Sequence, residues 1–207
     1  MDPRREYMAL RRRYGPQHWW PVDGPKGYEA AALEICVGAI LTQNTSWQNV
    51  KKALDNLRSA KAFSYKMLLT MPRKRLAQLI RPSGYYNQKA LKLQAFLTFV
   101  AAEYGGSFRK MFKQPAMALR EQLLAVHGIG KETADSMLLY AGNKPIFVVD
   151  AYTKRFLAEK GITFGDYDEY RVFFEKRLRR NVKLYQEFHA LIVAWGKEGS
   201  RKQNVAR

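Results

Sequence analysis

The chain has 207 residues, with 36 Lys and Arg against 18 Asp and Glu, so its formal net charge is +18 at pH 7. Apolar residues make up 47% of the chain and aromatic residues 13%, which supports a folded core and excludes a disordered basic tail. A folded protein this basic fits a polyanionic partner better than a neutral metabolite, because each neutralised phosphate releases counterions. Nucleic acid is therefore the first candidate partner, and an anionic membrane surface is the second.

The sequence also argues against membrane-spanning segments and against sites built from several cysteines. The longest apolar runs, such as residues 146–149, are too short to cross a bilayer, and the arginine-rich start lacks the apolar core of a signal peptide. We therefore expect an intracellular protein. Cys36 is the only cysteine, so the chain forms no internal disulfide, no four-cysteine zinc site and no four-cysteine iron–sulfur cluster.

The hydrophobic pattern predicts an all-α fold. Apolar residues recur every three or four positions, and strand patterns are almost absent. The expected helices cover residues 28–41, 48–58, 73–80, 87–104, 117–126, 132–141, 151–159 and 170–178. Glycines and prolines separate these segments, and no linker is long enough to divide the chain into independent domains.

Residues 123–134 depart from continuous helical patterning. They predict a helix, a tight turn at Gly128-Ile129-Gly130, and a second helix. The two glycines allow backbone conformations with positive φ and let another backbone approach closely. The free amides at the start of the second helix, at the positive end of its dipole, would then suit a DNA phosphate. A plain helical hairpin, in which the glycines only cap helices, explains this segment alone equally well.

Asp150 follows the apolar run 146–149 and precedes the helix expected over 151–159. In that position its carboxylate can cap the helix by accepting hydrogen bonds from the free amides of the first turn. A cap carboxylate that also faces a cleft can stabilise a positive charge. Asp150 is therefore the candidate catalytic residue, and the two roles are compatible.

The hairpin followed by Val148-Val149-Asp150 resembles the signature of the helix-hairpin-helix (HhH-GPD) DNA glycosylase superfamily, which includes endonuclease III. The resemblance extends to residues 40–45 and 81–90 and to Phe188-His189, so it covers most of the chain in the family's order. It implies two helical lobes with the DNA-binding cleft between them. The lobe over 28–142 would contain the hairpin at about 117–141, and residues 1–27 plus 143–207 would form the second lobe.

Within the superfamily, the chain most resembles the bacterial 3-methyladenine DNA glycosylases, which are similar to endonuclease III but lack its iron–sulfur cluster. Bifunctional members carry a Schiff-base lysine where this chain has Glu132. Lys131 lies one residue earlier, which turns it about 100° away on a helix. No cysteine follows Cys36, so the cluster cannot form. The resemblance thus implies a monofunctional glycosylase without a cofactor and without lyase activity.

The implied reaction flips an alkylated purine out of the duplex and hydrolyses its N-glycosidic bond, leaving an abasic site. Gln43 matches the gap-filling position, and Asp150 would stabilise the oxocarbenium-like sugar. Aromatic faces attract a cationic base, and the candidate base pocket comprises Trp47, Trp20, Pro21, Glu132 and Lys197. Two of these residues also have a role outside the pocket as an alternative: Glu132 could simply cap the second hairpin helix, and Lys197 could contact a phosphate.

The resemblance assigns phosphate binding to the hairpin residues His127, Gly128, Ile129, Gly130, Lys131 and Thr133. No metal is expected, because the histidines lack metal-ligand spacing, and His189 is assigned a structural role. We expect a monomer that acts on double-stranded DNA with a damaged base, without membrane contact, in the cytoplasm of a bacterium or archaeon and near its nucleoid. Two alternatives remain open: an endonuclease III-like glycosylase for oxidised or mismatched bases, and a non-catalytic helix-hairpin-helix DNA-binding protein.

Overall fold

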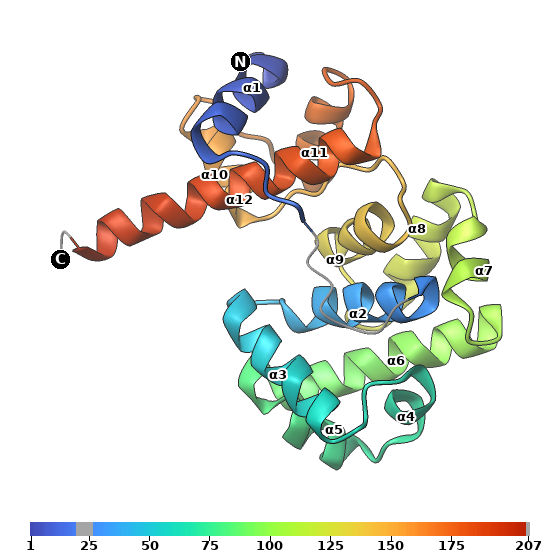
Figure 1. Ribbon diagram of the computed structural model, residues 1–207. Coiled ribbons are helices and arrows are strands. Elements are labelled where there is room, and N and C mark those ends of the chain that lie inside the picture. Colours follow the sequence, from blue (N-terminus) through green and yellow to red (C-terminus); the bar gives the residue numbers. More distant parts are fainter. Residues whose placement is uncertain (20–26, 206–207) are drawn as a thin grey trace. The chain divides into compact units, whose positions relative to one another are not determined.

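A computed structural model of the protein describes residues 1–19 and 27–205, with side chains described as far as residue 199 (Figure 1). Over these residues the chain is helical and contains no strand, which confirms the predicted all-α class. Within the same residues, no helix is both long enough and apolar enough to cross a membrane. The chain divides into two compact units, Met1–Pro21 with Asn143–Arg207, and Val22–Gly142. We call them the terminal unit and the central unit.

The terminal unit is built from both ends of the chain around a long C-terminal helix. It contains α1 (Pro3–Tyr14), α10 (Ala151–Ala158), α11 (Tyr167–Glu175) and α12 (Val182–Val205), and α12 packs against α1 and α10. Its core is aromatic: the rings of Phe147 and Phe174 stack at 4.1 Å, and Phe188 of α12 meets both edge-on. This packing anchors the segment that leads to Asp150.

Hydrogen bonds hold the same segment against α11. The amide of Phe147 donates to Glu175 Oε1 at 2.9 Å, and the amide of Val149 donates to the Tyr167 hydroxyl at 3.2 Å. Val148 and Val149 are both buried. The buried side chains of residues 146–149 and the amides of Phe147 and Val149 are therefore fixed, which leaves Asp150 little freedom of position.

The central unit is arranged around a buried helix, α2 (Tyr28–Leu41), in which every residue from Ala32 to Leu41 is buried. A helix that is buried on all sides must be surrounded, and α2 contacts α3, α6, α7, α9 and η2. Figure 1 shows α2 lying alongside the long α6. The other elements are α3 (Trp47–Ser59), α4 (Tyr65–Thr70), α5 (Arg73–Leu79), η1 (Arg81–Ser83), α6 (Tyr86–Tyr104), α7 (Phe108–Lys113), α8 (Ala116–Ala125), α9 (Lys131–Ser136) and the π-helix η2 (Met137–Ala141).

The predicted helix boundaries are confirmed at some places and wrong at others. The helix expected over 28–41 has these bounds in the structure. The helix expected over 170–178 begins earlier, at Tyr167, because Asp166 and Glu169 form a capping box there. The segment expected as one helix over 132–141 changes from α to π geometry at Met137. Helices α1, α4 and α7 were not predicted, and no bounds were predicted for the long α12.

Candidate functional site

Asp150 caps α10 in the terminal unit. Its Oδ1 accepts hydrogen bonds from the Thr153 amide at 2.7 Å and from the Thr153 hydroxyl at 2.9 Å. Its Oδ2 lies 3.5 Å from His189 Nε2, which α12 supplies. The Asp150 side chain is 16% exposed and that of His189 is 6% exposed. Oδ1 therefore caps the helix. The carboxylate as a whole is mostly buried but keeps some contact with solvent.

These contacts decide the charge of Asp150. Burial alone would raise the pKa of the carboxyl, but the neighbouring His189 imidazole and the two hydrogen bonds from Thr153 outweigh it and hold the pKa below its usual value. The carboxylate is thus ionised at neutral pH in a place with little water. A fixed, poorly solvated anion of this kind stabilises a nearby cation more strongly than an exposed one does.

Two further side chains of the terminal unit, Trp19 and Lys197, form a chain of contacts that begins at His189. The Trp19 ring meets the His189 ring edge-on at 6.2 Å, and the Lys197 ammonium lies 5.4 Å from the centre of the Trp19 ring. Trp19 and Lys197 line a cavity of about 370 Å³, together with Tyr14, Gln17, Ala190, Val193, Ala194 and Glu198. The structure therefore connects Asp150 to one predicted pocket residue, Lys197, through two residues that the sequence did not single out for the pocket.

The two glycines of the hairpin in the central unit differ in backbone conformation and in surroundings. Gly128 has φ +81°, and a Cβ added to it would lie 2.2 Å from Lys92 Cγ, so this position needs glycine for both reasons. Gly130 has φ −92° as the N-cap of α9, and a Cβ there would meet nothing within 4 Å. The expectation of two glycines with positive φ under a close backbone is wrong for Gly130, and at Gly128 the close neighbour is a side chain.

A buried ion pair joins the two helices of the hairpin. Arg120 of α8 donates to both carboxylate oxygens of Asp135 of α9, at 2.6 and 3.1 Å. The side chains are 7% and 0% exposed. Ile129, at the tip of the turn, is also buried. A bidentate pair of this kind fixes the angle between the helices as well as their separation, so the turn has a rigid base.

Gln43 is docked against the hairpin. Its Nε2 donates to the Gly128 carbonyl at 3.1 Å and to the Thr133 hydroxyl at 3.0 Å, while its Oε1 accepts from Lys92 Nζ at 2.6 Å. Thr133 is 7% exposed. The structure thus brings together three residues predicted for DNA contact, and it turns the Thr133 hydroxyl toward Gln43, from which that hydroxyl accepts a hydrogen bond.

The other predicted site residues lie as follows. Trp47 begins α3 directly after its N-cap Ser46 and is half-buried. In α9, Lys131 is half-buried and Glu132 is exposed, and His127 in the turn is exposed as well. Trp20 and Pro21 lie outside the described residues. Among the residues that are described, no group of three or more His, Cys, Asp and Glu side chains is placed to hold a metal ion.

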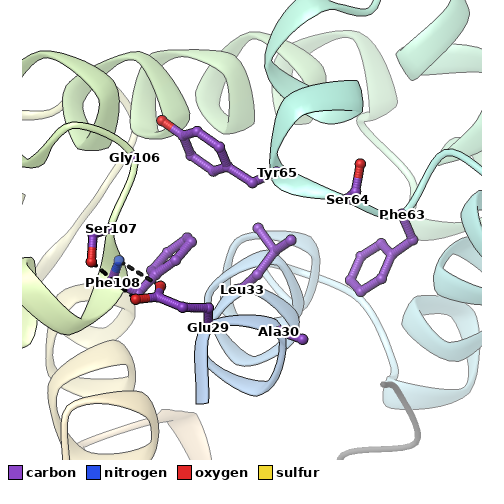
Figure 2. A pocket seen from close by; sticks show the side chains of 9 residues that line it. All are labelled: Glu29, Ala30, Leu33, Phe63, Ser64, Tyr65, Gly106, Ser107 and Phe108. Atoms are coloured by element: carbon purple, nitrogen blue, oxygen red, sulfur yellow. Dashed lines mark hydrogen bonds between the residues drawn. The ribbon is translucent and has the colours of Figure 1, made fainter. Parts of the chain in front are cut away.

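A larger cavity, of about 460 Å³, lies in the central unit and contains none of the predicted site residues (Figure 2). Figure 2 shows Glu29 reaching toward the start of α7, where its carboxylate accepts from the Ser107 hydroxyl and from the Phe108 amide. Leu33 and Phe63 line another part of the wall. The one acidic group of this cavity is therefore engaged in capping a helix, and nothing here resembles the chemistry around Asp150.

Sequence reasoning missed His189, Trp19 and Lys92 as site residues. His189 is separated from Asp150 by 39 positions, and periodicity carries no information on a contact at that range. The available signal was that Phe188-His189 is one of the motifs that carry the family resemblance. For Lys92 the signal was weaker, because it lies just beyond the motif at residues 81–90.

Comparison with known proteins gives a consistent result. Residues 37–180 match the HhH-GPD superfamily of base excision DNA repair proteins. A protein of Methanocaldococcus jannaschii named as a candidate DNA repair glycosylase is 42% identical over 201 residues, which are 95% of this chain and 88% of that protein. The crystal structure of the 3-methyladenine DNA glycosylase of H. pylori, bound to 1,N6-ethenoadenine, is 34% identical with a TM-score of 0.83, and the match covers 96% of this chain and 99% of that one. A trapped endonuclease III–DNA complex shares the fold, at 20% identity and a TM-score of 0.77 over 94% of this chain and 84% of that one.

Proposed function

The chain belongs to the HhH-GPD superfamily of base excision DNA repair proteins, and we propose that it is a monofunctional glycosylase for alkylated purines such as 3-methyladenine. The enzyme would flip the damaged base out of double-stranded DNA, hydrolyse its N-glycosidic bond and leave an abasic site. The observation that carries this proposal is the buried, ionised carboxylate of Asp150. The resemblance to the H. pylori 3-methyladenine glycosylase supports the choice of substrate.

The charge of the substrate explains why one carboxylate suffices. A purine alkylated at a ring nitrogen is already a cationic leaving group, so it departs without a strong general acid. The remaining task is to stabilise the oxocarbenium-like sugar, as carboxylates do in glycosidases. At an effective dielectric constant of about 20, a carboxylate about 4 Å from that cation contributes on the order of 4 kcal/mol, a rate factor of roughly a thousand. Asp150 would also orient the attacking water through the oxygen that does not cap α10.

Hydrolysis without strand cleavage is proposed from the position of Glu132. The bifunctional glycosylases that the chain resembles place their Schiff-base lysine there, and a glutamate cannot form that covalent intermediate. The neighbouring Lys131 precedes Glu132 by one residue, so its side chain leaves α9 about 100° around the helix axis from that of Glu132. Glu132 is exposed in the first turn of α9, where a negative charge is favourable near the helix dipole. We assign it to the base pocket or to this capping effect, and not to nucleophilic catalysis.

Base flipping would divide the DNA contacts between the two units. In the central unit, the backbone amides of the hairpin would bind a phosphate and Gln43 would fill the gap that the flipped base leaves. Trp47 would stack on the cationic base, together with Trp20 and Pro21. Lys197 already faces Trp19, and its positive charge disfavours contact with a cationic base, so we assign it to a DNA phosphate beside the pocket.

A base-release assay on duplexes that each carry one lesion tests this proposal. The set contains 3-methyladenine, 7-methylguanine, 8-oxoguanine, an oxidised pyrimidine and a thymine mismatch, and the released base is identified by chromatography. Release of 3-methyladenine, with no release of the oxidised or mismatched bases, is the expected result. Release of only the oxidised or mismatched bases would establish the endonuclease III-like alternative, and binding without any release would establish a non-catalytic DNA-binding protein.

A further inference from the structure

Lys92 lies between Gln43 and the hairpin and contacts both. Its ammonium donates to Gln43 Oε1 at 2.6 Å, and its aliphatic stem covers Gly128 so closely that a Cβ on that glycine would lie 2.2 Å from Cγ. Gln43 also donates two hydrogen bonds to the hairpin, to the Gly128 carbonyl and the Thr133 hydroxyl. Both ends of the Gln43 amide are therefore satisfied within the protein.

A second lysine of α6 braces the start of the same loop. Lys89, one turn before Lys92, is 2% exposed, and its ammonium donates to the Leu41 carbonyl at 2.8 Å and to the Ser83 carbonyl at 2.6 Å. Leu41 ends α2, two residues before Gln43. The backbone at the root of the loop is thus fixed independently of Lys92. Movement of Gln43 then depends on its side chain and on the three hydrogen bonds that hold it.

We propose that Lys92 is a positioning residue that latches Gln43 in a docked conformation and thereby limits the rate at which Gln43 inserts into DNA. This inference rests on the proposed gap-filling role of Gln43. Insertion requires the amide to leave all three partners, and the bond from Lys92 is the strongest of them because its donor is charged and the distance is the shortest. The latch would keep the side chain docked until a damaged base opens the stack.

The substitution Lys92→Met separates the latch from the packing. Methionine retains an unbranched apolar stem to cover Gly128 but cannot donate to Gln43. Lys52→Met, at an exposed lysine of α3, is the matched control for the loss of one positive charge in the same unit. Thermal unfolding of each variant checks that the fold is intact.

The experiment uses a duplex with a tetrahydrofuran abasic analogue opposite 2-aminopurine, whose fluorescence reports on stacking. In stopped-flow measurements, the concentration-independent phase after binding reports the insertion of Gln43. We expect this phase to be about tenfold faster for Lys92→Met than for the wild type, which corresponds to about 1.4 kcal/mol. Lys52→Met should leave it unchanged.

Measurements on Gln43→Ala, with and without Lys92→Met, distinguish a failure of the gap-filling role from a failure of the latch. We expect Gln43→Ala to remove the phase whether or not Lys92 is replaced. If Gln43→Ala leaves the phase unchanged, the gap-filling assignment fails. If Gln43→Ala removes it but Lys92→Met leaves it unchanged or slows it, the latch fails while gap-filling stands. A lower salt dependence of binding for Lys92→Met, by about one unit of slope, together with a slower phase would show that Lys92 binds a phosphate instead.

Discussion

Replacement of Asp150 by asparagine removes one charge and keeps the helix cap. Asparagine offers an oxygen in the place of Oδ1, which accepts from Thr153 at 2.7 and 2.9 Å, and Asp and Asn are nearly equal as N-caps. The fold and DNA binding should therefore persist. What is lost is the electrostatic stabilisation of the sugar cation, on the order of 4 kcal/mol at about 4 Å, so we expect excision to slow by roughly a thousandfold.

Single-turnover release of 3-methyladenine from alkylated DNA, with enzyme in excess, measures this effect without interference from product release. Asp166→Asn is the matched control, because Asp166 caps α11 in the same unit and has no proposed part in the reaction. It should leave the rate within a factor of about two. Excision by Asp150→Asn within tenfold of the wild-type rate, with unfolding and DNA binding unchanged, would refute the electrostatic role of Asp150.

Three further predictions concern the support of the site. Loss of one partner of the buried pair, by Arg120→Met or by Asp135→Asn, should lower the free energy of unfolding by about 3 kcal/mol or more in chemical denaturation, and a loss below about 1 kcal/mol would contradict it. Gly128→Ala should destabilise by more than about 1 kcal/mol because its φ is +81°, whereas Gly130→Ala, in open space at φ −92°, should cost clearly less because only its preference as an N-cap is lost; equal effects would contradict the assigned geometry. Burial lowers the pKa of Lys89 from 10.5 to about 8, so between those pH values the unfolded chain binds more protons than the folded one. The free energy of unfolding of the wild type should therefore rise relative to that of Lys89→Met from pH 7.5 to pH 10, and a constant or falling difference would contradict the burial of a charged lysine.

Helices with a complete apolar pattern were predictable from the sequence, and short or charged ones were not. The helix over 28–41 combines a continuous apolar run with a clear end, and its boundaries were right. Helices α4 and α7 have only six residues each, too few to show a period. Helix α1 has three arginines in its last turn, and its signal is a cap, Asp2 followed by Pro3, and not a stripe of apolar residues.

The candidate site, like the helices, was predictable from the sequence only in part. Asp150 as a helix cap followed from local chemistry, because an aspartate before a helical segment accepts from the first-turn amides. The contacts that make Asp150 an ionised and oriented group come from Thr153, within the same turn, and from His189 on another helix. The second contact depends on how α10 packs against α12, which no local pattern encodes. For the same reason the docking of Gln43 by Lys92 was visible only in three dimensions.

Analysis of both products of one reaction distinguishes a monofunctional hydrolase from a lyase. A duplex with 3-methyladenine and an end-labelled damaged strand is incubated with the enzyme, with and without borohydride, and the base and the strand are examined together. A monofunctional hydrolase predicts free 3-methyladenine, an intact strand with one abasic site and no borohydride-trapped adduct. A strand cleaved by the enzyme or a covalent enzyme–DNA adduct would contradict hydrolysis without lyase activity, because either requires an amine nucleophile such as Lys131 or another lysine, which Glu132 cannot supply.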